Sequence, residues 1–289
     1  MQTLGSRIAA LIAPLDPVSD SLQSALRDVF SQAPQPLRDL LDGTWLGAPL
    51  HPVLTDIPIG ASVAAVALDA LAMGDRDASL ERAADAALAV AVLGALPAAT
   101  TGLRDWSYVR GEAKRIGTGH ALLNTAALLL NCLSLRARHT GRRSTGRMFA
   151  ATGFGLTTLA AHLGGELSFG LGIRVNRTAF DAPGDTFVDV AGEDDVPDAG
   201  VSAVTAGDVD VVLARVDGRI CAIAATCSHL GGPLAQGERR DNDIVCPWHG
   251  SRFDLCTGDV VNGPAVYPQP VYDVKVADGR ISIRPSKNG

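Results

Sequence analysis

Four residues in the second half of the chain combine two thiols with two imidazoles. Cys227 and His229 are separated by one residue, and sixteen residues later Cys246 and His249 are separated by two. Two thiolates and two imidazoles can hold a cluster of two irons and two sulfides, with sulfur ligands on one iron and nitrogen ligands on the other. The spacing therefore predicts a metal centre whose protein ligands are divided unequally between two irons.

Two other interpretations use the same residues differently. A structural zinc site also takes two Cys and two His, but its pairs usually come as Cys-x-x-Cys followed by two spaced histidines. Inert thiols beside buried histidines are the second alternative, and they leave the flanking residues Gly231, Gly232, Pro247 and Gly250 unexplained. Glycines at such positions let backbone amides approach sulfur and tune an iron–sulfur centre.

The surrounding stretches resemble the cluster-binding loops of Rieske proteins. They read Cys227-Ser228-His229-Leu230-Gly231-Gly232 and Cys246-Pro247-Trp248-His249-Gly250-Ser251-Arg252-Phe253-Asp254. The resemblance covers about residues 187–286, and Gly263-Pro264-Ala265 falls where that family places a proline-bearing loop over the cluster. It implies a 2Fe-2S cluster held by Cys227, His229, Cys246 and His249, with Gly231, Gly250, Ser251 and Pro264 around it. Both ligand histidines are then expected near the surface.

Departures from one branch of that family indicate the kind of centre. Rieske proteins of quinol-oxidising complexes carry cysteines at the positions of Gly232 and Trp248, and a tyrosine where Phe253 stands. Fewer hydrogen bonds to the reduced, more negative cluster should lower its potential. We therefore expect the low end of the Rieske window of about −150 to +300 mV. The pattern is similar to Rieske-type ferredoxins. A terminal oxygenase is not expected, because it needs a further domain with a mononuclear iron.

The residues around these loops predict an all-β domain. Strand-like runs occur at 209–216, 219–225, 243–246, 271–276 and 280–284. Asp217-Gly218 and Asp278-Gly279 are typical hairpin turns between two pairs of these runs. We expect an antiparallel sandwich or barrel over 187–289, preceded by a linker at 176–186.

The first half of the chain predicts a four-helix transmembrane bundle over 45–175. Four apolar runs, at 58–73, 83–100, 120–135 and 148–171, approach the roughly 20 residues that cross a bilayer. A soluble bundle is the alternative, but it should show a regular polar stripe. Residues 1–44 form an amphipathic segment before the bundle. The expected fold class is thus α + β with two domains.

This half also resembles a bacterial family of four-helix membrane proteins known as a domain of unknown function. The motifs that carry the resemblance are His51-Pro52-Val53-Leu54-Thr55-Asp56-Ile57-Pro58-Ile59-Gly60, Gly102-Leu103-Arg104-Asp105-Trp106, His120, and His162 with Gly164-Gly165. The resemblance brings no established chemistry with it.

Several ionisable residues should gather in one half of the predicted bundle. Such groups are costly at membrane depth and often mark a function. The candidates for a haem, a metal ion or a quinone head group are His51, Asp56, Asp105, His120, His162 and Glu166. Interfacial histidines and helix-capping aspartates are the alternative interpretation.

Charge, cysteine use and the N-terminus bear on partners and location. The net charge of −6 resides in residues 174–289, which suits a basic redox partner and argues against nucleic acid. Cys132, Cys221 and Cys256 do not suggest a disulfide framework, and Cys256 is interpreted as a tolerated small residue. No export signal is visible, so we expect a multi-pass protein of the bacterial cytoplasmic membrane with its β domain in the cytoplasm. Basic residues are divided evenly between the two sides and do not settle the orientation.

Three functions are compatible with these features. The first is a membrane-anchored Rieske 2Fe-2S protein that passes single electrons to or from a redox partner. The second is a membrane oxidoreductase linked to quinone or haem. The third is the ferredoxin component of an oxygenase system, served by a reductase, whose helices only anchor it in the lipid.

Overall fold

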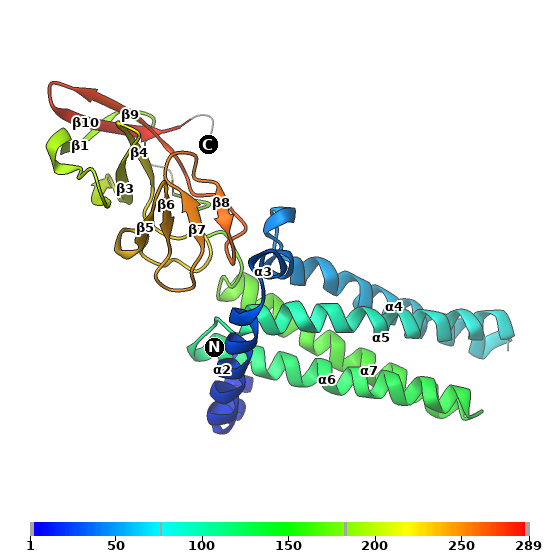
Figure 1. Cartoon of the computed structure of the whole chain (residues 1–289). Coiled ribbons are helices and arrows are strands. Elements are labelled where there is room, and N and C mark those ends of the chain that lie inside the picture. The colour runs from blue at the N-terminus through cyan, green and yellow to red at the C-terminus, as the bar shows by residue number, and fades with distance from the viewer. Residues whose placement is uncertain (1–2, 76, 182–183, 287–289) are drawn as a thin grey trace. The chain divides into compact units, whose positions relative to one another are not determined.

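The computed structural model describes residues 3–75, 77–181 and 184–286. It divides into two compact units, one made of residues 1–32 and 50–173 and the other of 33–49 and 174–289. The first unit is helical and the second is built mainly of antiparallel strands (Figure 1). The α + β fold class is confirmed.

Four long helices make up most of the first unit. They are α4 (Leu50–Asp75), α5 (Ala78–Trp106), α6 (Gly111–His139) and α7 (Arg143–Gly165), and they lie side by side (Figure 1). Helices α4, α5 and α6 each contain one of the predicted apolar runs, whereas the fourth run, 148–171, extends past the end of α7. Within the described residues, α4 as far as Met73, α5 and α6 are long and apolar enough to cross a membrane. The fourth span therefore remains a prediction.

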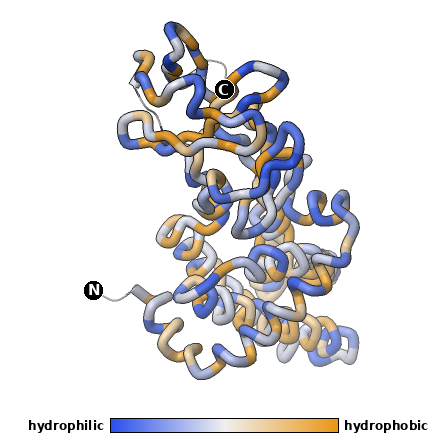
Figure 2. Tube along the Cα trace, turned by 60° about the vertical axis from the view of Figure 1, so that its left-hand side comes forward, coloured by the Kyte–Doolittle hydropathy of each residue, from blue (hydrophilic) through white to orange (hydrophobic). Residues whose placement is uncertain are grey.

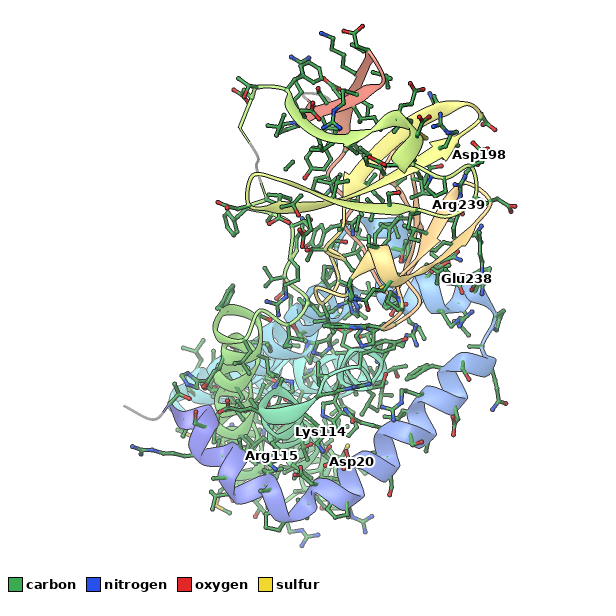
Figure 3. The ribbon with its side chains drawn as sticks, turned by 90° about the vertical axis from the view of Figure 1, so that its left-hand side faces the viewer. Asp20, Lys114, Arg115, Asp198, Glu238 and Arg239 are labelled. Atoms are coloured by element: carbon green, nitrogen blue, oxygen red, sulfur yellow. A yellow bond between two sulfur atoms is a disulfide. The ribbon has the colours of Figure 1, made fainter. Side chains whose placement is uncertain are left out.

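Two shorter helices precede the long ones and pack on them. Helix α1 (Leu4–Ile12) buries Ala9 against Ile116 and Leu163. Helix α2 (Asp16–Gln32) is tied to α6 by ion pairs, with Lys114 Nζ 2.7 Å from Asp20 and Arg115 Nη2 2.6 Å from Asp16 (Figure 3). The N-terminal amphipathic segment thus lies against the helical unit as far as residue 32.

A network of charges joins the ends of α4 and α6 to the beginnings of α5 and α7. Arg138 has a side chain only 2% exposed, and its guanidinium pairs with Asp69 and, at 2.8 Å, with Asp85. Arg143 Nη2 lies 3.0 Å from Asp85, and Arg147 Nη2 lies 2.9 Å from Glu81. Buried charges are tolerated when they are paired in this way, and each helix contributes at least one member.

The second unit contains three antiparallel sheets, ordered β1-β10-β9, β2-β3-β4 and β5-β6-β7-β8. The strands are β1 (Val188–Gly192), β2 (Ser202–Ala206), β3 (Val209–Val216), β4 (Arg219–Ala224), β5 (Glu238–Arg240), β6 (Asp243–Val245), β7 (Arg252–Asp254), β8 (Val260–Asn262), β9 (Tyr272–Ala277) and β10 (Arg280–Pro285). The five predicted strands correspond to β3, β4, β6, β9 and β10.

Strand β3 separates two hydrophobic cores because successive side chains point to opposite faces. Val212 and Val216 join Ile244 and Phe253 in the core beneath the predicted cluster loops. Leu213 joins the other core, against β9 and β10. Hydrophobic residues recur along strands and helices alike (Figure 2).

Both predicted hairpin turns are confirmed. In the β3–β4 turn, Asp217 has φ 49° and Gly218 has φ 77°. In the β9–β10 turn, Asp278 has φ 51° and Gly279 has φ 70°. Two consecutive residues with positive φ match the right-handed twist of the flanking strands, which explains the Asp-Gly sequences.

Residues 33–49 belong to the β unit, although they precede the long helices in the chain. Helix α3 (Gln35–Asp42) begins after Pro34 and ends at Gly43, which has φ 84°. A left-handed glycine commonly ends a helix because it has no Cβ to clash. The packing of residues 33–49 on the β unit was not predicted, because the sequence suggested one continuous segment over residues 1–44.

The charge network generates the first prediction. Asp69→Asn should lower the free energy of unfolding of the helical unit by about 3 kcal/mol, because it leaves the buried Arg138 undercompensated. The thermal midpoint of the purified protein would measure this loss. The exposed Asp28 of α2 offers the control Asp28→Asn, expected to change stability by less than about 0.5 kcal/mol. Equal midpoints for the two variants would contradict the structural role of the network.

Candidate metal centre

The two candidate ligand loops have the same backbone design. In the first, the N–H of Cys227 donates to Gly232 O at 2.8 Å and the N–H of Gly231 donates to Cys227 O at 2.9 Å. In the second, Cys246 donates to Ser251 O at 2.8 Å and Gly250 donates to Cys246 O at 3.0 Å. The fourth residue after each cysteine is a left-handed glycine, Gly231 with φ 81° and Gly250 with φ 77°. Each loop can close in this way because glycine adopts positive φ without strain.

Loop closure directs backbone amides at the two thiols. The N–H groups of His229 and Leu230 hydrogen-bond to the sulfur of Cys227, and those of Trp248 and His249 to the sulfur of Cys246. The two thiols also hydrogen-bond to each other. The hydrogen bond from Cys227 lowers the pKa of Cys246 to about 7. The two backbone amides act in the same direction, and burial acts in the opposite one. Such amides stabilise negative charge on sulfur, as a metal thiolate requires.

The two candidate imidazoles have the separation of ligands that share one tetrahedral metal. The ring centres of His229 and His249 are 5.2 Å apart and the ring planes are perpendicular, at 90°. With a metal–nitrogen bond of about 2.0–2.1 Å and roughly 1.1 Å from nitrogen to ring centre, a tetrahedral angle gives about 5.2 Å between ring centres. The Nδ1 atom of His229 is buried, so this nitrogen faces the interior. The histidine pair therefore fits one iron of a 2Fe-2S cluster.

The arrangement disfavours the zinc alternative. A structural zinc site needs all four ligands around one ion. Among the described residues, no three His, Cys, Asp or Glu side chains converge on a single metal position. A thiol pair and a separate imidazole pair instead match a centre with two metals, one for each pair.

Gly232 is required by the close approach of the two loops. A Cβ atom on this residue would lie 2.7 Å from Cys246 Sγ and 3.2 Å from the Trp248 ring. In this chain, a side chain at this position would therefore require the sulfur of the second loop to move. The same glycine replaces the cysteine that ties the loops together in the quinol-oxidising branch.

The proline-bearing loop is bonded to both ligand loops. The N–H of Ala265 donates to Ser251 Oγ at 2.9 Å, and Ser228 Oγ donates to Tyr267 O at 2.7 Å. Ser251 is fully buried, so its side chain links the loop at Pro264 to the second ligand loop from inside the fold. The loop that contains Pro264 therefore contacts both ligand loops.

Residues 33–49 hold the other side of the proline-bearing loop. The N–H of Gly263 donates to Asp39 Oδ1 at 2.9 Å, next to the start of the loop. Arg174 donates from Nη1 to Pro264 O at 2.7 Å and from Nη2 to Asp42 O at 2.6 Å. The proline-bearing loop therefore lies between the ligand loops and residues 33–49, which belong to the same unit but come much earlier in the chain.

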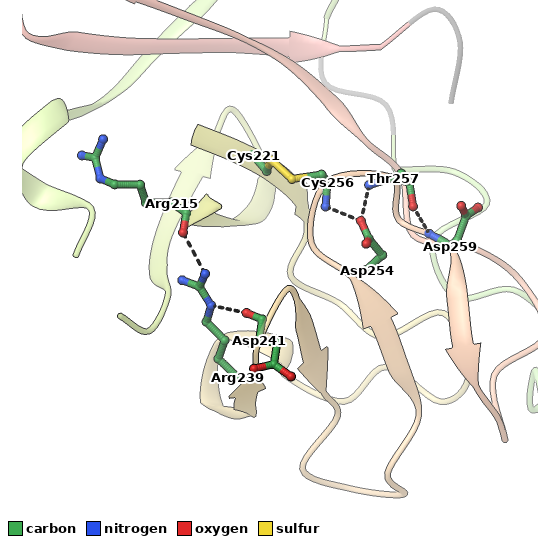
Figure 4. Close-up of a disulfide and its surroundings, with 8 residues drawn as sticks. All are labelled: Arg215, Cys221, Arg239, Asp241, Asp254, Cys256, Thr257 and Asp259. Carbon is green, nitrogen blue, oxygen red and sulfur yellow. Dashed lines mark hydrogen bonds between the residues drawn. A yellow bond between two sulfur atoms is a disulfide. The ribbon is translucent and has the colours of Figure 1, made fainter. Parts of the chain in front are cut away.

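The expectation that Cys221 and Cys256 belong to no disulfide framework is wrong. The two residues form a disulfide across 35 positions, with Cα atoms 4.9 Å apart (Figure 4). Asp254 Oδ1 accepts from the N–H of Cys256 at 2.8 Å and of Thr257 at 2.7 Å, which fixes the turn that carries Cys256. The disulfide connects the strand before the first ligand loop to the turn after the second. It was missed because only the fold brings the two cysteines together.

The expectation that both ligand histidines lie near the surface is only half right. His249 is partly exposed, but His229 is just 5% exposed. His229 lines a small cavity with Arg174, Ser228, Pro264 and Tyr267, because the proline-bearing loop folds over it. Trp248, which is 55% exposed, stands beside His249 with ring centres 6.3 Å apart.

The candidate membrane residues differ in their surroundings. His51 and His120 do meet, with ring centres 6.3 Å apart. The carboxylate of Glu166 instead accepts from Gly5 N at 2.9 Å and from Thr3 Oγ1, as a cap for the start of α1. Asp56 and His162 are exposed, and Asp105 is partly buried. Glu166 therefore caps the start of a helix, and the histidine pair is considered separately below.

Comparisons with known proteins agree with this description of the two units. Residues 186–273 match the family model of the Rieske [2Fe-2S] domain. Residues 47–177 match the model described as a predicted membrane protein, DUF2231.

Three relatives each match about a third of this chain. The ferredoxin component of naphthalene 1,2-dioxygenase/salicylate 5-hydroxylase systems from Ralstonia sp is 31% identical over 34% of this chain and 94% of its own length. The cytochrome b6-f complex iron-sulfur subunit of Chlorobaculum tepidum is 33% identical over 31% of this chain and 48% of its own length. A solved structure, the ferredoxin of carbazole 1,9a-dioxygenase from Nocardioides aromaticivorans IC177, is 32% identical, with a TM-score of 0.34, over 35% of this chain and 99% of its own.

The contact at Gly232 generates the second prediction. Gly232→Ala should reduce bound iron and acid-labile sulfide by at least tenfold, because the added methyl group displaces Cys246 Sγ. Gly184→Ala is the matched control, since a Cβ there meets nothing within 4 Å. Colorimetric iron and sulfide assays on both purified variants test this. Full iron and sulfide content in Gly232→Ala would show that the two loops do not approach as described.

Proposed function

This chain belongs to the Rieske [2Fe-2S] family through residues 186–273, and on that premise we propose that it is a membrane-anchored carrier of single electrons. The observation that carries the proposal is the pair of matched loops, which bring two amide-bonded thiols together and hold two imidazoles 5.2 Å apart. Cys227 and Cys246 would hold one iron, and His229 and His249 the other. When bound, the cluster supplies reversible uptake of one electron.

The residues around the loops suit an electron carrier better than a site of bond-making chemistry. Amides directed at sulfur stabilise the added negative charge without moving a proton. The buried core that contains Phe253 and Ile244 supports the loops and excludes water. Partly exposed His249 and its neighbour Trp248 provide the route by which a partner can approach.

A protein partner is the proposal that the comparisons support. The relative from Ralstonia sp is by its name a ferredoxin component of oxygenase systems. We propose a comparable redox protein, a reductase or an oxygenase, as the partner of this chain. The net negative charge of residues 174–289 would favour a partner with a basic docking surface.

The disulfide supports a location different from the one expected from the sequence. Disulfides persist in oxidising compartments and are rare in the cytoplasm. We therefore propose that the β unit faces the outer side of the bacterial cytoplasmic membrane, with α4, α5, α6 and α7 in the lipid, because an even number of spans is needed to return residues 174–289 to the side of residues 33–49. The absence of a recognisable export signal had suggested the cytoplasm, but apolar helices can themselves direct insertion into the membrane.

The third prediction concerns the reduction potential. An EPR-monitored redox titration should place it in the lower part of the window of about −150 to +300 mV. Phe253→Tyr adds a hydroxyl group in the core that contains Cys227 and Cys246. A hydrogen bond to the reduced centre worth about 1.5–3 kcal/mol would raise the potential by roughly 60–130 mV. The exposed Phe187 gives the control Phe187→Tyr, with no shift expected. A wild-type potential at the upper end of the window would refute the ferredoxin-like assignment.

The fourth prediction concerns orientation. Asp208→Cys, at an exposed position between β2 and β3, is combined with Cys132→Ser to remove the exposed native thiol. In intact cells a membrane-impermeant maleimide should label the new cysteine as fully as it does after lysis. Labelling only after lysis would show that the β unit lies in the cytoplasm. Cys132→Ser alone controls for background labelling.

A further inference from the structure

The four long helices form two hairpins that repeat one local design. In the α4–α5 hairpin, His51 of the first helix places Nδ1 2.8 Å from the carbonyl oxygen of Ala98 in the second. In the α6–α7 hairpin, His120 of the first helix places Nδ1 2.8 Å from the carbonyl oxygen of Ala160 in the second. Each histidine is therefore hydrogen-bonded to the backbone of the other helix of its hairpin.

A glycine accompanies each histidine at the same offset. Gly102 follows Ala98 by four residues, and Gly164 follows Ala160 by four. A Cβ on Gly102 would lie 2.7 Å from Cε1 of His51, and one on Gly164 would lie 3.3 Å from Cε1 of His120. The two hairpins therefore each provide a carbonyl to orient an imidazole and a glycine to make room for it.

The carbonyl contacts define which nitrogen carries the proton. A carbonyl oxygen only accepts, so Nδ1 of each ring is protonated and Nε2 holds the lone pair. A second contact agrees for His120, since the side-chain amide of Asn124 donates to its Nε2 at 3.1 Å. That amide also lies 3.1 Å from the carbonyl oxygen of His120, and so keeps an acceptor if Nε2 binds something else. Metal-bound histidines are usually oriented by such a backbone contact at the other nitrogen.

The separation of the two rings points to ligands on opposite sides of one metal. Their centres are 6.3 Å apart and their planes are nearly perpendicular, at 83°. With metal–nitrogen bonds of about 2.0–2.1 Å, imidazoles on opposite sides of a metal have ring centres about 6.3 Å apart, against about 5.2 Å for a tetrahedral pair. The His51–His120 pair matches the first value, whereas the His229–His249 pair matches the second.

Two protein ligands suffice only for a metal that brings other ligands with it. Among the described residues, no third His, Cys, Asp or Glu joins this pair to complete a site for a bare ion. A haem supplies four nitrogens in its own plane and takes two axial ligands from the protein. An oxidised quinone would need donors for its carbonyl oxygens, but both ring N–H groups are directed at backbone carbonyls.

We propose that the helical unit binds one haem between its two hairpins, with His51 and His120 as axial ligands through Nε2. The proposal does not depend on the iron–sulfur cluster of the β unit, because all of its residues lie within 50–173.

The fifth prediction tests this site on the full-length protein, purified from membranes of haem-replete cells and titrated with haemin. We expect about one haem per chain by the pyridine haemochrome assay. The ferric form should give a strongly anisotropic low-spin EPR signal, because perpendicular imidazole planes leave two iron orbitals nearly equal in energy. His51→Ala and His120→Ala should each reduce bound haem at least tenfold. His162→Ala, on exposed α7 surface, is the matched control and should retain it.

Two further measurements keep the result interpretable. The EPR signal of the reduced iron–sulfur cluster should be unchanged in both alanine variants, which shows that the β unit still folds. His120→Met should retain haem with a raised reduction potential, because a thioether favours ferrous iron. Protein with a full iron–sulfur content but no haem after titration would overturn the proposal. Unchanged haem in both alanine variants, or stoichiometric zinc or quinone in its place, would do so as well.

Discussion

Backbone amides directed at two buried thiols are the constraint on which the rest of the β unit depends. The amides can take these directions because each loop closes through a glycine with positive φ, Gly231 or Gly250. The same closure sets the positions of His229 and His249, since each ligand histidine lies within the closed turn. Gly232 then allows the two loops to meet with no side chain between them. The site formed in this way is covered by the proline-bearing loop, which is bonded in turn to Arg174 and to residues 33–49.

The two units place polar groups in different ways. In the β unit, polar contacts converge on one set of loops through Ser228, Ser251 and Asp39. In the helical unit, the network around Arg138 occupies one end of the four helices, while His51 begins α4 at the other. Charges at the first end are paired with one another and link the four helices there. The two histidines at the second end are oriented by backbone carbonyl oxygens, those of Ala98 and Ala160.

The features predicted correctly from the sequence are those encoded by neighbouring residues. The Asp-Gly turns and strands such as β3 each depend on a few adjacent positions, so their patterns are visible in the chain. The Cys221–Cys256 disulfide and the packing of residues 33–49 depend on residues that only the fold brings together. The same reason explains why His51 and His120 could be named as candidates but not separated from Asp56, His162 and Glu166. Which ionisable residue meets which is decided by helix rotation, and the apolar runs define that rotation poorly.

The central claim is that sulfur ligands hold one iron and imidazoles hold the other. Pulsed EPR on the reduced full-length protein labelled with ¹⁵N-histidine tests it most directly. We expect hyperfine couplings from two inequivalent histidine nitrogens on the cluster signal, and the loss of one coupled nitrogen when His249 is replaced by cysteine. A cluster signal with no strongly coupled histidine nitrogen would contradict the account, because it would mean that four sulfur ligands, or ligands from elsewhere, hold the irons.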